Sequence, residues 1–194
     1  IHGTPNDDVV ILQAGTQLHT VTANQVIYEF DASQVTEIKF IGNDGDDEAT
    51  IIGTELDDEV VLRPSRGAMS SSQYELQVED VNTITADGQT GDDNAFLVDS
   101  AEDDVLEATE SMAMMRDVNF TYVNEVQGFE SVTGNAIVGG NDVANLFDTI
   151  ADDVLFLRPG FAQLLGDGIE MRAVGFESVE ATADAEGNDR VEFT

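Results

Sequence analysis

The sequence contains no cysteine and no tryptophan, and basic residues are scarce. Without cysteine the chain can form neither a disulfide framework nor a thiolate zinc site, so oxygen atoms are the expected ligands of any bound metal. Lys and Arg total 7 against 40 Asp and Glu, which gives a formal net charge of −33. A surface of this charge repels other polyanions, and this argues against nucleic acid and anionic membranes as partners.

Long apolar runs are also missing. No run of about 18 apolar residues occurs, so we expect no membrane insertion, and the first residues lack the basic-then-apolar pattern of an export signal. The chain is still 41% hydrophobic, which is enough to build a core. An acidic, cysteine-free composition favours a secreted or cell-surface protein whose signal lies outside this segment, although an acidic intracellular protein of a salt-adapted cell would look similar.

Catalytic patterns are scarce too. His2 and His19 are the only histidines, and neither has a nearby Ser or Cys nucleophile pattern. Lys39 is the sole lysine, and no phosphate-binding glycine-rich loop leads to it. We therefore expect no catalytic residues and no enzyme activity.

What the sequence does contain is an internal repeat. Paired aspartates recur at intervals of 50, 46 and 49 residues, at Asp7-Asp8, Asp57-Asp58, Asp103-Asp104 and Asp152-Asp153. A second acidic turn follows each pair, at Gly45-Asp46-Asp47, Gly91-Asp92-Asp93, Gly140-Asn141-Asp142 and Gly187-Asn188-Asp189. The repeat predicts one domain over residues 1–194, with units of about 48 residues at 3–52, 53–98, 99–147 and 148–194.

Each acidic turn is followed by alternating apolar residues, as in Val10 and Leu12 or Val60 and Leu62, which is the pattern of a strand with one buried face. We count about four strand-like runs per unit. Helical spacing is nearly absent, except around Met112–Arg116, which could be a short helix, a loop or an exposed contact surface, or a stretch whose methionines fill the core. The pattern predicts an all-β, right-handed parallel β-solenoid, either a β-helix or a β-roll. Four strands in about fifty residues also describe a β-propeller blade, which is the alternative.

The acidic turns are candidate calcium sites, because glycine permits a tight turn while carboxylates and carbonyls supply the oxygens that calcium prefers. The expected ligands are Asp44, Asp46, Asp47, Asp57, Asp58, Asp92, Asp93, Asp103, Asp104, Asn141, Asp142, Asp152 and Asp153. We expect two neighbouring turns to bring Asp46 and Asp47 close to Asp57 and Asp58, where unpaired carboxylates would raise one another's pKa. The alternative is that Asp, Asn and Gly shape these turns through hydrogen bonds without a metal.

The segments Gly139–Leu146 and Gly42–Ala49 resemble hemolysin-type (RTX) calcium-binding repeats, in which glycine-rich turns of stacked coils hold calcium ions. The family's nine-residue period is absent here. The longer unit is similar to tandem-repeat regions of very large secreted proteins of marine bacteria, which implies a stretch of a longer array.

The expected function is a non-catalytic, extracellular, calcium-binding structural or adhesive repeat module. Its expected partners are calcium ions, neighbouring repeats and other copies of itself. The alternative is a carbohydrate-binding or carbohydrate-active β-helix, which would present a groove lined with exposed aromatic residues.

Overall fold

The computed structural model describes residues 1–166, 168–183 and 186–193, and all regular secondary structure in these residues is β-strand. The strands are β1 (Val9–Gln13), β2 (Leu18–Ala23), β3 (Val26–Asp31), β4 (Glu37–Ile41), β5 (Glu48–Ile52), β6 (Glu59–Arg63), β7 (Arg66–Ser70), β8 (Glu75–Glu79), β9 (Thr83–Asp87), β10 (Asn94–Val98), β11 (Asp104–Ala108), β12 (Met112–Asp117), β13 (Val123–Gln127), β14 (Ser131–Asn135), β15 (Val143–Phe147), β16 (Val154–Arg158), β17 (Phe161–Leu165), β18 (Glu170–Val174), β19 (Ser178–Thr182) and β20 (Arg190–Phe193). Within these ranges no helix is suited to crossing a membrane.

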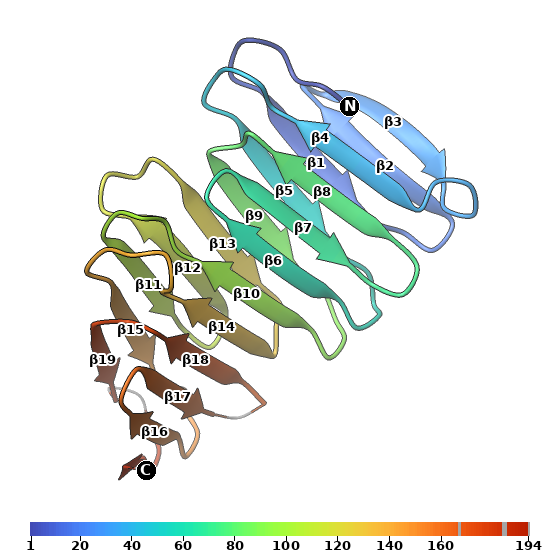
Figure 1. Cartoon of the computed structure of the whole chain (residues 1–194). Coiled ribbons are helices and arrows are strands. Elements are labelled where there is room, and N and C mark those ends of the chain that lie inside the picture. The colour runs from blue at the N-terminus through green and yellow to red at the C-terminus, as the bar shows by residue number, and fades with distance from the viewer. Residues whose placement is uncertain (167, 184–185, 194) are drawn as a thin grey trace.

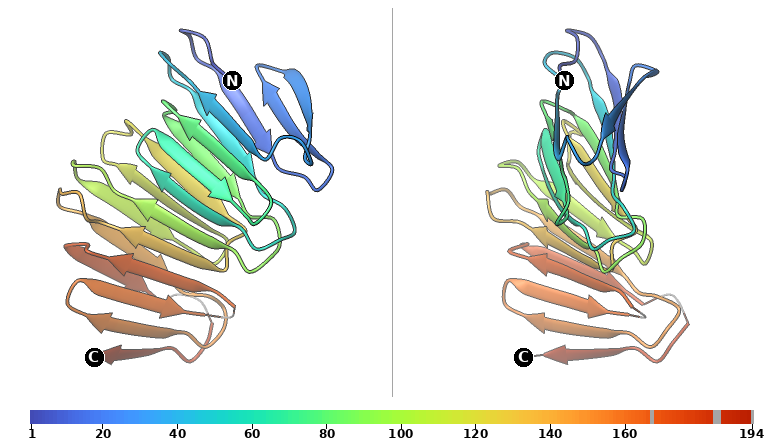
Figure 2. Two further views of the ribbon diagram at one scale, coloured as in Figure 1. Left: turned by 45° about the vertical axis from the view of Figure 1, so that its right-hand side comes forward. Right: turned by 90° about the vertical axis from the view of Figure 1, so that its right-hand side faces the viewer.

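The strands form two ten-stranded sheets that pack face to face (Figures 1 and 2). One sheet has the order β19-β15-β11-β12-β13-β9-β5-β1-β2-β3, and the other has the order β20-β16-β17-β18-β14-β10-β6-β7-β8-β4. Strands of successive coils lie side by side and parallel, so that Val10 faces Ala49 and Ala49 faces Ile84. This confirms the predicted all-β solenoid, with about five coils. Two continuous sheets running the length of the stack are incompatible with the blades of a propeller.

Each of the four expected units contains five strands, not four. A unit opens with a three-stranded antiparallel meander, such as β6-β7-β8, and continues with one strand in each sheet. The additional strand is the middle one of each meander. It is hard to predict from the sequence because buried positions such as Gly67, Ala113 and Ala162 hold small residues, which weaken the apolar alternation. The chain changes sheets three times between the start of one unit and the start of the next, so successive units begin in opposite sheets.

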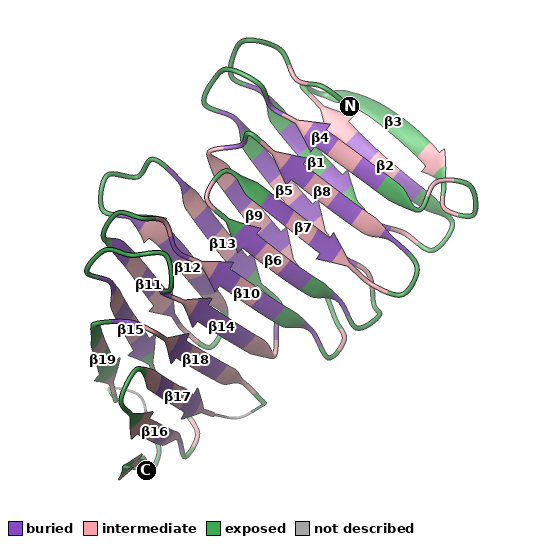
Figure 3. Cartoon of the chain, viewed as in Figure 1, coloured by how far each residue is buried: buried purple, intermediate pink, exposed green. Residues whose placement is uncertain are grey.

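The core lies between the sheets, where every second residue of most strands is buried (Figure 3). Leu12, Ile51, Leu62 and Leu97 are fully enclosed there. The stretch Met112–Arg116 is part of β12, because it pairs with β11 on one side and β13 on the other. Met115 is fully buried, so this methionine does fill the core.

Candidate metal centre

The acidic turns lie in two rows at opposite sides of the solenoid, where the chain passes between the sheets. The turns before β1, β5, β11 and β15 form the first corner row, because these strands run in one direction in one sheet. The turns before β6, β10, β16 and β20 form the second corner row. Asp47 and Asp58 therefore lie in different rows, and the expectation that two consecutive turns bring them together is wrong. One strand separates consecutive turns, and it carries the chain across the sheet.

Carboxylates of adjacent coils in the same row are in contact instead. The aspartate pair that opens each unit contacts the second acidic turn of the same unit, one coil later. Two hydrogen bonds from backbone N–H groups to carboxylates join the two turns. The inner backbone N–H groups donate to the inner carboxylates in the pairs Asp8 to Asp47 (2.8 Å), Asp58 to Asp93 (2.7 Å), Asp104 to Asp142 (2.8 Å) and Asp153 to Asp189 (3.0 Å). The outer N–H groups donate in the opposite direction, in the pairs Asp46 to Asp7, Asp92 to Asp57, Asn141 to Asp103 and Asn188 to Asp152. These hydrogen bonds join the turns of adjacent coils along each row.

The first type of turn, which opens each unit, satisfies its inner carboxylate further. One oxygen accepts the N–H group of the Thr or Ser four residues earlier, as in Thr54 to Asp58 at 2.8 Å. In the first three units a meander side chain donates to the other oxygen, namely Asn24 to Asp8, Tyr74 to Asp58 (2.6 Å) and Tyr122 to Asp104 (2.5 Å). Asn24 lowers the pKa of Asp8. Burial, together with the adjacent carboxylate, raises the pKa of both tyrosines.

The fourth unit departs from this arrangement. Ile169 occupies the position before β18 that Tyr74 occupies before β8 and Tyr122 before β13, so no hydroxyl is supplied to Asp153 from there. The bonds that Asp153 accepts in the described residues come from the N–H group and hydroxyl of Thr149. A small cavity of about 80 Å³ lies against the carboxylate and is lined in part by Leu155 and Leu164.

The same turn carries an additional carboxylate. Asp148 stands at the position that glycine holds in the first two units, at Gly3 and Gly53. One carboxylate oxygen from each of Asp148, Asp153 and Asp189 lies within 4.8 Å of the other two. Calcium binds oxygens at roughly 2.3–2.6 Å, so oxygens on opposite sides of one ion are about 5 Å apart. Three carboxylate oxygens at this separation could bind one hard divalent cation.

The sequence predicted only one of these three residues, Asp153. Asp189 belongs to the fourth acidic turn, but it is not among the ligands that the sequence predicts. Asp148 was detectable from the change of glycine to aspartate at one repeat position. The pairing of both with Asp153 required knowledge of which coils are adjacent.

In the second type of turn, the inner carboxylate accepts fewer hydrogen bonds than in the first type. Asp47, Asp93 and Asp142 are 0 to 2% exposed, and the Oδ2 atoms of Asp47 and Asp93 have no hydrogen-bond partner in the described part of the chain. In these turns Asn43 and Gln89 have left-handed backbones, with φ of 76° and 72°, where the first type has Thr or Ser. Burial raises the pKa of Asp47, and it raises the pKa of Asp93 and Asp142 to about 6.

The first corner row holds a group of three carboxylates that is equivalent to Asp148, Asp153 and Asp189 but more deeply buried. Asp99, Asp104 and Asp142 occupy the same repeat positions one unit earlier. Asp99 is 2% exposed; its Oδ2 accepts the N–H group of Val138 at 2.8 Å, and its Oδ1 has no partner among the described residues. Tyr122 already bonds Asp104, so this group has less capacity for an ion. The remaining predicted ligand, Asp44, is exposed in its turn.

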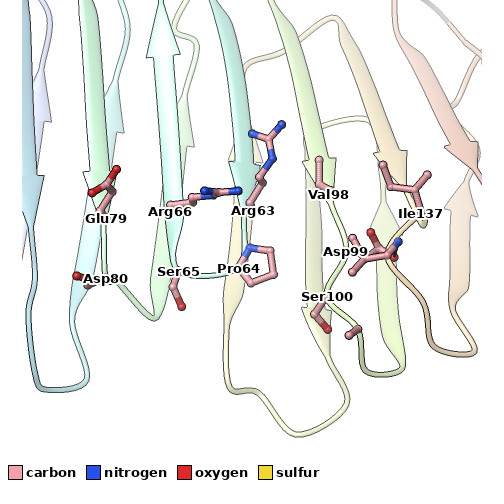
Figure 4. A pocket seen from close by; sticks show the side chains of 12 residues that line it. Arg63, Pro64, Ser65, Arg66, Glu79, Asp80, Val98, Asp99, Ser100 and Ile137 are labelled. Carbon is pink, nitrogen blue, oxygen red and sulfur yellow. Dashed lines mark hydrogen bonds between the residues drawn. The ribbon is translucent and has the colours of Figure 1, made fainter.

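A surface pocket of about 810 Å³ lies beside Asp99 (Figure 4). Arg63 and Arg66 line it from the hairpin between β6 and β7, and Asp99 and Ile137 line it from neighbouring coils. None of its lining residues is aromatic. It therefore lacks the aromatic surface that the carbohydrate-binding alternative requires.

Comparison with models of known protein families, with curated proteins and with solved structures found no match to this chain.

Proposed function

We propose that the chain is a non-catalytic structural repeat module, clamped by buried carboxylates along both corner rows and bound to calcium at Asp148, Asp153 and Asp189. The observation that carries the calcium site is the group of three carboxylates within 4.8 Å. The missing meander hydroxyl at Ile169 supports it, since Asp153 retains acceptor capacity that Asp58 and Asp104 have lost to a tyrosine.

The formal charge of −33 supports the same proposal from a different direction. Compacting so many like charges costs free energy, and a bound divalent cation offsets part of that cost where carboxylates converge. An acidic, cysteine-free solenoid is suited to an extracellular rod, in a surface layer, a matrix or an adhesive fibre. Outside the cell calcium is plentiful, so a site of modest affinity would be filled.

The test is calorimetric titration of the chain with calcium, combined with thermal unfolding in calcium, in magnesium and in chelator. We expect calcium to bind and to raise the melting temperature, because a ligand of the folded state stabilises it. The double variant Asp148→Asn/Asp189→Asn should lose most of the calcium-dependent shift. Both substitutions keep side-chain shape and leave the bond from Thr149 to Asp153 in place.

The matched control is Asp99→Asn/Asp142→Asn, which removes the same two repeat positions from the first corner row. Its calcium-dependent shift should remain close to that of the unmodified chain. An equal loss in both double variants would show that calcium acts on the general charge and not at this site. Equal melting in calcium and chelator would remove calcium from the proposal.

A further inference from the structure

Two arginines of this acidic chain have no electrostatic partner. Arg63 and Arg66 are exposed, and neither side chain forms an ion pair, a hydrogen bond or a ring contact within the part of the chain that the structure describes. The other five basic residues each form an ion pair or lie over an aromatic ring: Lys39, Arg116, Arg158, Arg172 and Arg190. With 40 acidic residues in the chain, two unpaired guanidinium groups require an explanation.

The two arginines also face each other. They close the hairpin between β6 and β7, where Arg63 and Arg66 are directly opposite in the antiparallel register. Figure 4 shows the Arg66 side chain extending toward Arg63. Like charges at opposite positions of a strand pair are destabilising. An anion bound between them would replace this repulsion with attraction, because the planar N–H donors of a guanidinium group match the oxygens of a carboxylate or sulfate.

The fourth unit contains the same hairpin without the repulsion. Its segment Arg158-Pro159-Gly160-Phe161 aligns with Arg63-Pro64-Ser65-Arg66, and Arg158 is directly opposite Phe161. The Arg158 guanidinium lies 4.2 Å from the centre of the Phe161 ring. An aromatic ring of the chain itself is therefore the partner of the arginine in the fourth unit. In the second unit an arginine replaces this ring, and both guanidinium groups stay available to a ligand.

The hairpin borders the pocket of about 810 Å³, a volume suited to a small organic molecule. Val98 lies at the end of β10, the strand that pairs with β6, so an apolar wall begins next to Arg63. Ile137 and Val138 continue this wall and are 69% and 57% exposed. Figure 4 shows Val98 and Ile137 on one side of Arg63 and Arg66 on the other. The pocket thus joins two cationic groups to an apolar surface.

Acidic side chains restrict what this pocket can hold. Glu79, Asp80 and Asp99 also line it, although Lys39 pairs with Glu79 and the N–H group of Val138 donates to Asp99. The formal charge of the whole chain is −33. A polyanion would be repelled through every charge that it carries, whereas a ligand with a single anionic group is repelled through one. The chemistry therefore favours a small monoanion.

We propose that the hairpin of β6 and β7 and its adjoining pocket bind a small organic monoanion. Its carboxylate or sulfate group lies between Arg63 and Arg66, and its apolar portion lies against Val98, Ile137 and Val138. The site is separate from the carboxylates proposed to bind calcium, which lie in the second corner row. The inference adds a ligand to the repeat module and so goes beyond its proposed function.

The test is calorimetric titration in chelator, at constant ionic strength, with hexanoate, hexyl sulfate and hexanol. We expect one or both anions to bind, and the tighter of them identifies the preferred head group as carboxylate or sulfate. Hexanol carries the same alkyl chain without a charge and should bind at least about tenfold more weakly, because it cannot form charge-assisted hydrogen bonds. Binding of neither anion would overturn the proposal, and so would equally tight binding of the alcohol.

A substitution in each of the two equivalent hairpins tests the location. Arg63→Gln should weaken binding of the anion at least about tenfold, since it removes one of the two guanidinium groups. The matched control is Arg158→Gln, which removes the same charge at the same repeat position and should leave the affinity unchanged. Equal weakening in both variants would assign the effect to net charge and overturn the site. Both arginines are exposed, so we expect both variants to fold, and circular dichroism checks this.

Arg66→Phe gives the second unit the hairpin of the fourth. Without an anion its melting temperature should exceed that of the unmodified chain, because a cation–π contact replaces the repulsion. The anion should raise the melting temperature of the unmodified chain but not that of this variant. An equal rise in both proteins would contradict the proposal. All of these measurements are made in chelator, so they neither depend on calcium binding nor decide it.

Discussion

At the scale of single residues, the buried carboxylates of this acidic chain are distinguished by their hydrogen-bond donors. Asp58 and Asp104 each receive a turn N–H and a tyrosine hydroxyl, whereas Asp47 and Asp93 keep one oxygen without a partner in the described residues. A hydrogen bond to the ionised form stabilises that form, and burial without one disfavours it. Carboxylates that look alike in the sequence therefore differ in the hydrogen bonds that they accept and in their remaining capacity for a cation.

The position before the third strand of each meander provides a test of this reasoning. Ile169→Tyr should supply Asp153 with the hydroxyl that Asp58 and Asp104 already have. The ring would extend toward the cavity of about 80 Å³ beside Asp153. We expect a higher melting temperature in chelator and a smaller increase on adding calcium, because the hydroxyl and the ion compete for the same carboxylate oxygen.

Ile169→Phe is the control, since it brings the same ring without the hydroxyl. It should leave the calcium response nearly intact. If both variants reduced the response equally, the effect would come from filling the cavity and not from the hydrogen bond. Melting curves in calcium and in chelator measure all three proteins.

At the scale of the strand and turn, the turns themselves could be predicted from the sequence, but the turns that lie next to each other in space could not. The Asp pairs, the glycines and the alternating apolar residues that follow them act locally, and local patterns are visible in a sequence. Contact between Asp8 and Asp47 depends on how many strands lie between them, and the meander strand β2 was not recognised. The pairing of Asp46 and Asp47 with Asp57 and Asp58 was wrong for a different reason, because β5 carries the chain from one side of the solenoid to the other between these turns. The solenoid itself was predicted correctly.

The close approach of adjacent coils makes a further prediction about the turns. A Cβ atom at Gly140 would lie 2.1 Å from the Glu102 carbonyl oxygen, and the φ of this glycine is 114°. Gly140→Ala should lower the free energy of unfolding by more than about 1 kcal/mol, because the backbone of the neighbouring coil cannot yield.

Gly139→Ala separates the clash from the backbone strain. Its φ is 140°, yet nothing lies within 4 Å of an added Cβ atom. Urea unfolding should show a clearly smaller loss for this variant. Similar losses at both positions would mean that the left-handed backbone alone requires glycine and that the coil contact does not.

At the scale of the whole molecule, two effects make stability depend on pH in the same direction. Raising the pH ionises more of the 40 acidic residues and increases self-repulsion. Locally, burial raises the pKa of Asp93 and Asp142 to about 6, from 3.8 for an unperturbed carboxyl. A group with a raised pKa binds its proton more tightly in the folded state, so its contribution to stability is complete below about pH 4 and is lost as the pH rises through about 6.

High salt separates the two effects, because it screens exposed charges far more than a buried desolvated carboxyl. In chelator and high salt, the melting temperature should rise as the pH falls from about 7 to about 5. The variant Asp93→Asn/Asp142→Asn should flatten this profile, since an amide neither titrates nor carries the desolvation cost. Above pH 5 the opposite contribution of Asp8 is small, because its lowered pKa keeps it ionised in both states. An unchanged slope in the double variant would assign the pH dependence to net charge alone and remove the buried carboxyls from the explanation.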